Sequence, residues 1–189
     1  MEGFGLDGPV GNWKRLREEI FDDVCEHGYD SKRNTFTQYY GSRALDASLL
    51  LMSSVGFLPA SDKRLVGTIA AIEKELCHDG FVQRYTMTTQ TERLDGLPPG
   101  EGAFLPCTFW LADSYLLAGR VDEGRKVLER LLGLRNDLGL LSEEYDTDAR
   151  RLVGNFPQAL THLALVNTAL DLQSDQGPSH RRADTGQAR

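Results

Sequence analysis

The stretch from Ala103 to Ala118 reads Ala-Phe-Leu-Pro-Cys-Thr-Phe-Trp-Leu-Ala-Asp-Ser-Tyr-Leu-Leu-Ala, with Asp113 as its only charge. A helix that is hydrophobic on every side has to be covered on every side. The next stretch, Val121 to Arg135, places its charged residues outside a narrow stripe of Val127, Leu128 and Leu131. The pair predicts a buried helix followed by an amphipathic helix that covers it.

The same alternation runs through the whole chain. Amphipathic helices are predicted at about residues 13–26 and 61–77, the second opening at Ser61, and further buried helices at about 43–55 and 157–172. Six helices in an inner and an outer layer satisfy this pattern, so we predict an all-α fold. An α-solenoid fits less well, because its helices usually keep a solvent face and the sequence has no repeat of fixed period.

Composition limits the possible functions. A chain of 189 residues suits one domain or part of a larger one, and its net charge of −7 argues against nucleic acid as a partner. The longest apolar runs are too short for a membrane span, and the N-terminus does not read as a signal peptide, so we expect a cytoplasmic protein. The three cysteines lack a Cys-x-x-Cys spacing and the four histidines lack ligand spacing. Reduced thiols, no metal and no cofactor are therefore expected.

The connections before the three buried helices are long and should emerge at one end of the helix layers. The third connection contains Gly139-Leu-Leu-Ser-Glu-Glu-Tyr-Asp146 and then Gly154-Asn-Phe-Pro-Gln158. Carboxylates beside an aromatic ring and amides suit sugar chemistry, because they can polarise a water, cover a pyranose face and bind hydroxyls. Long ordered loops in a compact domain usually carry function.

Five stretches of the sequence match a known family: Tyr40–Leu51, Gly100–Ala112, Leu132–Asp137, Leu141–Asp146 and Gly154–Gln158. In them the sequence resembles the C-terminal half of the catalytic domain of glycoside hydrolase family 15, the family of glucoamylases and some bacterial trehalases. The family fold is an (α/α)6 toroid of twelve helices in two rings, so the resemblance implies a partial toroid with about six of those helices over residues 13–172. Residues 1–12 would then be a linker and residues 173–189 a disordered tail.

The resemblance implies an inverting hydrolase of α-glucosidic bonds. Such enzymes use two carboxyl groups about 6.5–9.5 Å apart, so that a water fits on the face opposite the leaving group. The family's general base corresponds to Glu143, with Glu144 as the rival that only the motif excludes. The family's general acid lies in the half of the ring that this chain does not match. We therefore expect a truncated or split member that is inactive alone; the alternative is a non-catalytic helical-hairpin interaction module.

Several further residues are candidates for contact with the sugar. Arg84 lies in Gln83-Arg-Tyr85, which resembles the family's Arg-Tyr, and the alternative is an exposed loop arginine. Glu101 lies in a loop that points toward the proposed mouth, between glycines that allow close backbone approach, and can also be a helix-terminal acid with no function. Asp46 either lines the pocket or pairs with Arg43. For His162 a satisfied core position is favoured over a place at the mouth. The remaining candidates are Tyr39, Tyr145, Asn155 and Gln158. For the two tyrosines, packing in the core is an equally good interpretation.

Half a ring leaves apolar helix sides uncovered. Exposed patches of that size predict association. We therefore expect self-association or pairing with an N-terminal half, beside an α-glucoside or oligosaccharide substrate.

Overall fold

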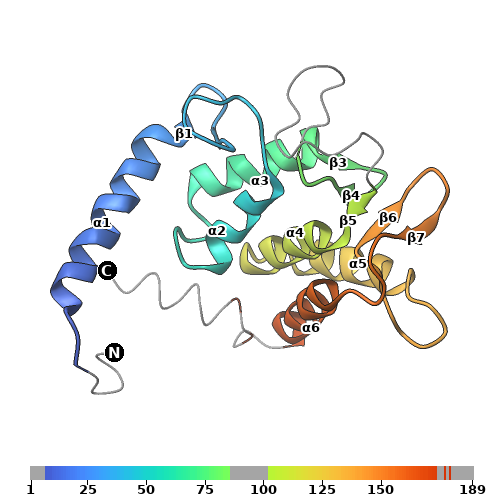
Figure 1. Cartoon of the computed structure of the whole chain (residues 1–189). Helices are drawn as coiled ribbons and strands as arrows, with labels where there is room; N and C mark the ends of the chain where they lie inside the picture. The colour runs from blue at the N-terminus through green and yellow to red at the C-terminus, as the bar shows by residue number, and fades with distance from the viewer. Residues whose placement is uncertain (1–6, 86–101, 174–176, 178, 180–189) are drawn as a thin grey trace.

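The structure is a computed structural model that describes residues 7–85, 102–173, 177 and 179. It is mostly helical, as predicted, and its strands are only two or three residues long (Figure 1). The helices are α1 (Val10–His27), the 3-10 turn η2 (Ala47–Leu50), α2 (Leu51–Ser54), α3 (Lys63–Glu75), α4 (Leu105–Leu117), α5 (Val121–Leu132) and α6 (Ala159–Gln173).

The strands form three small antiparallel sheets in the connections between helices. β1 (Tyr29–Asp30) pairs with β2 (Thr35–Phe36), and β3 (Cys77–His78) pairs with β4 (Phe81–Val82). β6 (Glu144–Asp146) lies between β5 (Ala103–Phe104) and β7 (Arg151–Val153). These sheets occupy the connections that the sequence marks as long.

Helix α4 is the centre of the molecule. Eleven of its thirteen residues are buried, because α2, α5, α6 and β4 all pack around it. Its few polar groups are satisfied inside the protein: Thr108 Oγ1 accepts the N–H of Val82 at 2.9 Å, and Thr168 Oγ1 donates to Asp113 Oδ1 at 2.6 Å. The predicted buried helix is thus confirmed.

The predicted helix at 43–55 is shorter than expected. Residues before Ala47 are extended, since Gln38 N–H donates to Ala44 O at 2.9 Å and Asp46 forms a β-bridge with Tyr85. Asp46 has φ −132° and ψ 137°, and its side chain accepts the N–H of Ser48. It is therefore the N-terminal cap of a short helix, not a charge on the side of a buried one.

Two other boundaries also differ from the sequence expectation. The cap of α3 is Asp62, which accepts the N–H of Arg64, and not Ser61. The first helix begins at Val10, inside the segment predicted as a linker. Most of the predicted tail lies outside the described residues, as does all of 86–101.

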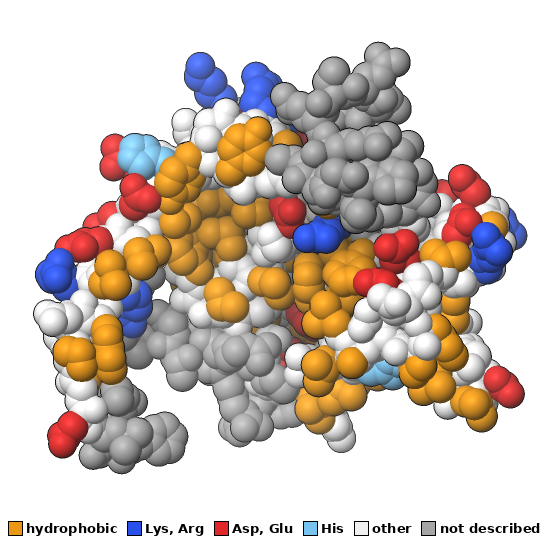
Figure 2. All heavy atoms as spheres, in the orientation of Figure 1, with side chains coloured by type: hydrophobic (Ala, Val, Ile, Leu, Met, Phe, Trp, Pro, Cys, Tyr) orange, Lys and Arg blue, Asp and Glu red, His pale blue; other side chains and the backbone are white. Residues whose placement is uncertain are grey.

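Helix α6 was expected to be buried all round, and that expectation is wrong for this chain. Its buried positions are small or polar, and Leu165 and Leu172 pack against the core. Its other large apolar side chains point outward: Leu160, Leu163, Val166 and Leu170 are between 44% and 63% exposed. Among the described helices, α4 and α5 are the ones that pack closely against it. Figure 2 shows hydrophobic side chains gathered over this helix.

Helix α1 projects from the body (Figure 1). Phe21 and Val24, near its C-terminal end, pack on the cluster built around Phe36, Leu58 and Leu65, yet none of its eighteen residues is fully buried. Toward its N-terminus the stripe of Trp13, Leu16 and Ile20 is about half exposed. Within the described residues, no helix combines the length and the hydrophobicity needed to cross a membrane.

Candidate active site

The three long connections meet at one end of the helix layers, as the sequence predicted. β5 leads into α4 and pairs with β6 of the following connection, with Ala103 opposite Tyr145 and Phe104 opposite Glu144. The β-bridge between Asp46 and Tyr85 joins the first connection to the second, and Ala47 N–H donates to Arg84 O at 2.7 Å. Backbone pairing therefore joins the three connections that carry the candidate residues.

Glu143 is held by its backbone and by its carboxylate. Its N–H donates to Asn155 O at 2.9 Å, and its own carbonyl accepts the N–H of Leu105 at the start of α4 at 3.0 Å. The side-chain Oε2 accepts the N–H of Asn155 at 3.1 Å. Gly154, with φ +76°, passes so close that a Cβ there would lie 3.0 Å from Glu143 Cβ. The half-buried carboxylate therefore has a fixed position beside the Gly154–Asn155 backbone.

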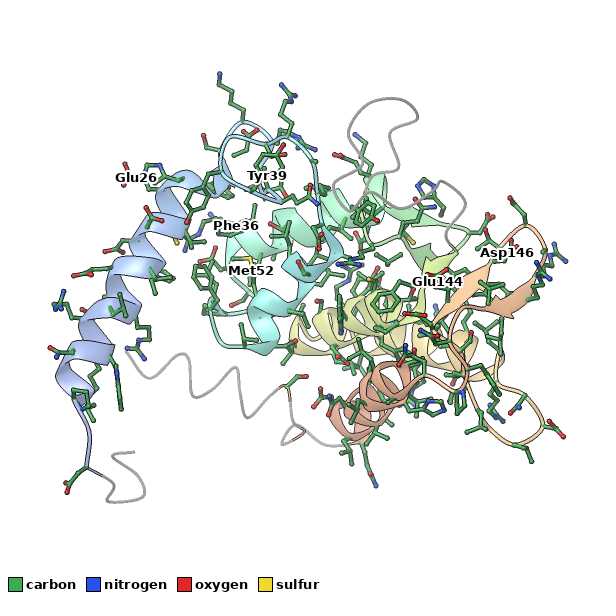
Figure 3. The ribbon with its side chains drawn as sticks, in the orientation of Figure 1. Glu26, Phe36, Tyr39, Met52, Glu144 and Asp146 are labelled. Carbon is green, nitrogen blue, oxygen red and sulfur yellow. The ribbon has the colours of Figure 1, made fainter. Side chains whose placement is uncertain are left out.

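Glu144 lies in a different environment from Glu143. Its Oε2 accepts the N–H of Gly102 at 2.9 Å, and its side chain lines a cavity of about 480 Å³ together with Gln83 and Asp146. Figure 3 places Glu144 beside β5 and Asp146 farther out along the β6–β7 hairpin. Glu143 is not among the described residues that line this cavity. The two neighbouring carboxylates thus have different surroundings: Glu144 lines this cavity, and Glu143 lies against the Gly154–Asn155 backbone.

Tyr145 lies against an aromatic neighbour. Its ring centroid is 4.9 Å from that of Phe81, with 31° between the planes, and both rings line a second cavity of about 440 Å³. Arg130 lies over the other ring of the pair, with its guanidinium carbon 4.7 Å from the Phe81 centroid. Tyr145 therefore serves packing and also borders open space.

Asp46 and Arg84 come together with two further side chains that the sequence did not single out. Gln38 Nε2 donates to Asp46 Oδ2 at 3.4 Å, and the Arg84 guanidinium carbon lies 5.7 Å from the ring centroid of Tyr85. Arg84 is exposed and Asp46 half-buried. The ion pair of Asp46 with Arg43 is not formed in the described part of the chain. Residues in extended loops leave no periodic pattern in a sequence. Tyr85 is therefore identified by its backbone bridge to Asp46, and Gln38 by its hydrogen bond to the Asp46 side chain.

The other candidates are dispersed. Tyr39 is 50% exposed, and Figure 3 shows it on the loop after β2, apart from Glu144. Asn155 is exposed and contributes its backbone to Glu143. Gln158 is half-buried at the start of α6, where its N–H donates to Leu141 O at 3.1 Å. Glu101 lies outside the described residues.

Both ring nitrogens of His162 contact backbone groups. Its Nδ1 lies 2.7 Å from Gln158 O, and its Nε2 is 3.3 Å from Leu141 N. The ring is half-buried. Both nitrogens therefore have partners within the fold.

The three cysteines are free thiols, and burial raises the pKa of the Cys107 thiol. A buried thiol with a raised pKa is a poor nucleophile. Within the described residues, no group of three His, Cys, Asp or Glu side chains is arranged to hold a metal ion.

Comparison with solved structures finds glycosidases. A glycosidase variant and a glycosidase variant in complex with glucose both superpose with a TM-score of 0.70 at 21% identity, covering 84% of this chain and 43% of theirs. At this identity the likeness establishes the fold alone, which is the helical glycosidase fold expected from the sequence.

Comparison with curated proteins finds trehalases. The trehalase of Thermoplasma volcanium is 44% identical over 170 residues, or 89% of this chain and 26% of that protein. The trehalase of Mycobacterium tuberculosis is 46% identical over 158 residues, or 84% of this chain and 23% of that protein. The chain thus spans about a quarter of these relatives. The sequence model described as "Glycosyl hydrolases family 15" matches residues 1–170, and the chain belongs to this family.

Proposed function

We propose that this chain forms the base-bearing wall of an inverting hydrolase of α-glucosidic bonds, with trehalose as the first substrate to test. The observation that carries the proposal is the fixed Glu143 carboxylate, bound by the Asn155 N–H at 3.1 Å in a segment tied to the starts of α4 and α6. Relatives named trehalases, 44% and 46% identical, support the choice of sugar.

The reaction assigns one proton transfer to this chain. A water oxygen forms a new bond to the anomeric carbon while Glu143 takes a proton from that water. The bond from the anomeric carbon to the leaving sugar breaks, and the leaving oxygen takes a proton from a general acid outside the residues to which we give roles. Attack from the face opposite the leaving group inverts the anomeric centre.

The sugar would be held by groups from the other two connections. Arg84 offers a planar set of donors that can bind two hydroxyls at once. Asp46 and Gln38 next to it offer an acceptor and an amide. Tyr145 borders open space and can cover a pyranose face. Tyr39, Asn155, Gln158 and Glu101 stay as candidates for the rim of the site.

The uncovered helices favour a partner that completes the ring. α6 buries Thr161, Ala164 and Thr168 and exposes leucines. A surface helix usually buries its apolar residues and exposes its polar ones. The chain covers only 43% of the solved glycosidases that share its fold, so the complementary helices have an obvious source in a longer ring. We propose that a second helical segment of that ring covers α6 and α1, and self-association of this chain is the competing outcome.

A chimaera tests the function. The 170 residues of this chain that match the Thermoplasma volcanium trehalase would replace the matching segment of that protein, and release of glucose from trehalose would be measured. Glu143→Gln keeps an oxygen for the Asn155 N–H, and Glu144→Gln keeps one for the Gly102 N–H, so the two variants are matched. We expect Glu143→Gln to lower kcat by about 10²–10⁴-fold and Glu144→Gln to lower it far less.

The opposite ranking would transfer the role of base to Glu144, which faces the larger described cavity. Equal activity of both variants and the parent chimaera would rule out a base in this segment. The 189-residue chain alone should release no glucose at enzymatic rates, because it would lack the acid.

A further inference from the structure

The segment that carries Glu143 runs beside the start of α6, and a short series of hydrogen bonds ties them together. Gln158 N–H donates to Leu141 O at 3.1 Å, Thr161 Oγ1 donates to Ser142 O at 2.9 Å, and Glu143 N–H donates to Asn155 O at 2.9 Å. These three bonds use groups that do not titrate near neutral pH. The fourth bond joins Leu141 N–H to an imidazole nitrogen of His162.

The two partners of His162 fix its protonation state. Gln158 O can only accept, so Nδ1, at 2.7 Å from it, carries a proton. Leu141 N–H can only donate, so Nε2, at 3.3 Å from it, presents a lone pair. The fold therefore requires a neutral imidazole with its proton on Nδ1. A second proton would set an N–H against an N–H at a residue, Leu141, that is fully buried.

We propose that neutral His162 is a positioning residue for Glu143: its Nε2 accepts the Leu141 N–H and so holds the segment that bears the base. The proposal rests on the proposed role of Glu143. Because Glu143 lies two residues after Leu141, a shift of the anchored backbone moves the carboxylate directly.

The surroundings of His162 offer no charged partner that would hold the imidazolium. Within the described residues, no carboxylate lies within ion-pair distance of either ring nitrogen. The charged groups to consider on the neighbouring elements are Asp171 in α6, Asp113 in α4, Glu129 in α5, and Arg135, Asp137 and Glu143 in the connection. Of these, Asp113 is bound to Thr168, Asp171 to the Ser179 N–H and Glu143 to the Asn155 N–H.

The test uses His162→Gln in the chimaera. A glutamine can accept from Leu141 N–H with its oxygen and donate to Gln158 O with its amide. We expect His162→Gln to keep a kcat close to that of the parent, because both bonds to the backbone remain. KM should change little, because Arg84 and Asp46 lie on other connections.

His162→Leu supplies the control without an acceptor. Its kcat should fall by up to about 10²-fold, since a small misplacement of a catalytic group can cost that much. A kcat of His162→Leu equal to that of the parent, with Glu143→Gln still inactive, would overturn the positioning role and leave the proposed function intact. An active Glu143→Gln would instead remove the proposed function.

A second measurement decides the matter if the variants do not fold. In the 189-residue chain with ¹⁵N-labelled histidine, the nitrogen resonances of His162 at about pH 8 should report a proton on Nδ1 and a bare Nε2. A proton on Nε2 at that pH would contradict the inference, since Leu141 N–H would then have no acceptor there.

Discussion

Helices α4 and α6 are alike in sequence and different in structure. Both are apolar with a single carboxylate, yet α4 buries eleven of thirteen residues and α6 buries four of fifteen. α4 has helices on several sides, whereas α6 has α4 and α5 on one side only. The comparison teaches that hydrophobicity around a helix predicts that it needs cover, and does not predict which part of a protein supplies that cover.

The largest expected difference comes from the same substitution in each helix. Leu111 is 2% exposed and Leu163 is 63% exposed. Leu111→Ala should lower the free energy of unfolding by about 2–5 kcal/mol, while Leu163→Ala in the isolated chain should stay within about 0.5 kcal/mol. Urea midpoints of the two variants check this. In the chimaera Leu163→Ala should become costly, and a cost that is already large in the isolated chain would mean that α6 is covered there.

Charges on the outward face of α6 should prevent association. Each leucine that a partner buries is worth about 1.5–3 kcal/mol, so Leu163→Lys with Leu170→Lys should shift sedimentation of the chain toward the monomer. Val55→Lys is the control, because Val55 is 62% exposed on a different part of the molecule and should change nothing. A parent chain that is already monomeric would argue against an apolar interface.

The two glycines that flank these helices separate backbone strain from contact with Glu143. Gly119, after α4, and Gly154, before α6, both have φ +76°, but a Cβ at Gly119 would meet nothing within 4 Å. Alanine at either position should cost about 1–2 kcal/mol of stability through its left-handed backbone. Only Gly154→Ala should also lower kcat of the chimaera, since it displaces the carboxylate. Equal kcat for both variants would contradict the close contact.

The smallest expected change in stability concerns α3, whose N-terminal cap Asp62 is bonded to Arg64 in the same helix. The hydrogen bond from Arg64 lowers the pKa of the Asp62 carboxyl below its usual range. A lowered pKa contributes stability above the unfolded value, and that stability is lost as pH falls through the folded value. Asp62→Asn should therefore cost less than about 1 kcal/mol at neutral pH and nothing at strongly acidic pH. Thermal melts along a pH series, in chain and chimaera alike, measure it.

The sequence predicted the helices well where local pattern and packing agree. α4 and α5 lie within two or three residues of expectation, because one is covered by neighbours in this chain and the other has a clear amphipathic stripe. The start of the helix after Arg43 was missed, since Asp46 pairs with distant Tyr85 instead of continuing the helix. The exposure of α6 was missed because hydrophobicity around a helix does not show how much of it its neighbours cover.

The sequence named candidate site residues, and the structure adds the contacts that hold them. The motif points to Glu143, and the structure adds the neighbours that hold it, Gly154 and the Asn155 N–H. Hydrogen bonds between distant backbone segments leave no periodic trace in a sequence. Gln38 beside Asp46, and the two backbone partners of His162, therefore became visible only in three dimensions.

The anomeric form of the first glucose released from trehalose by the chimaera tests the central claim most directly. If Glu143 activates a water on the face opposite the leaving sugar, the attacked ring becomes β-glucose and the leaving ring stays α. Proton NMR at early times should then show equal amounts of the two anomers. Release of α-glucose alone would mean retention of configuration, and Glu143 could not be the base of an inverting reaction.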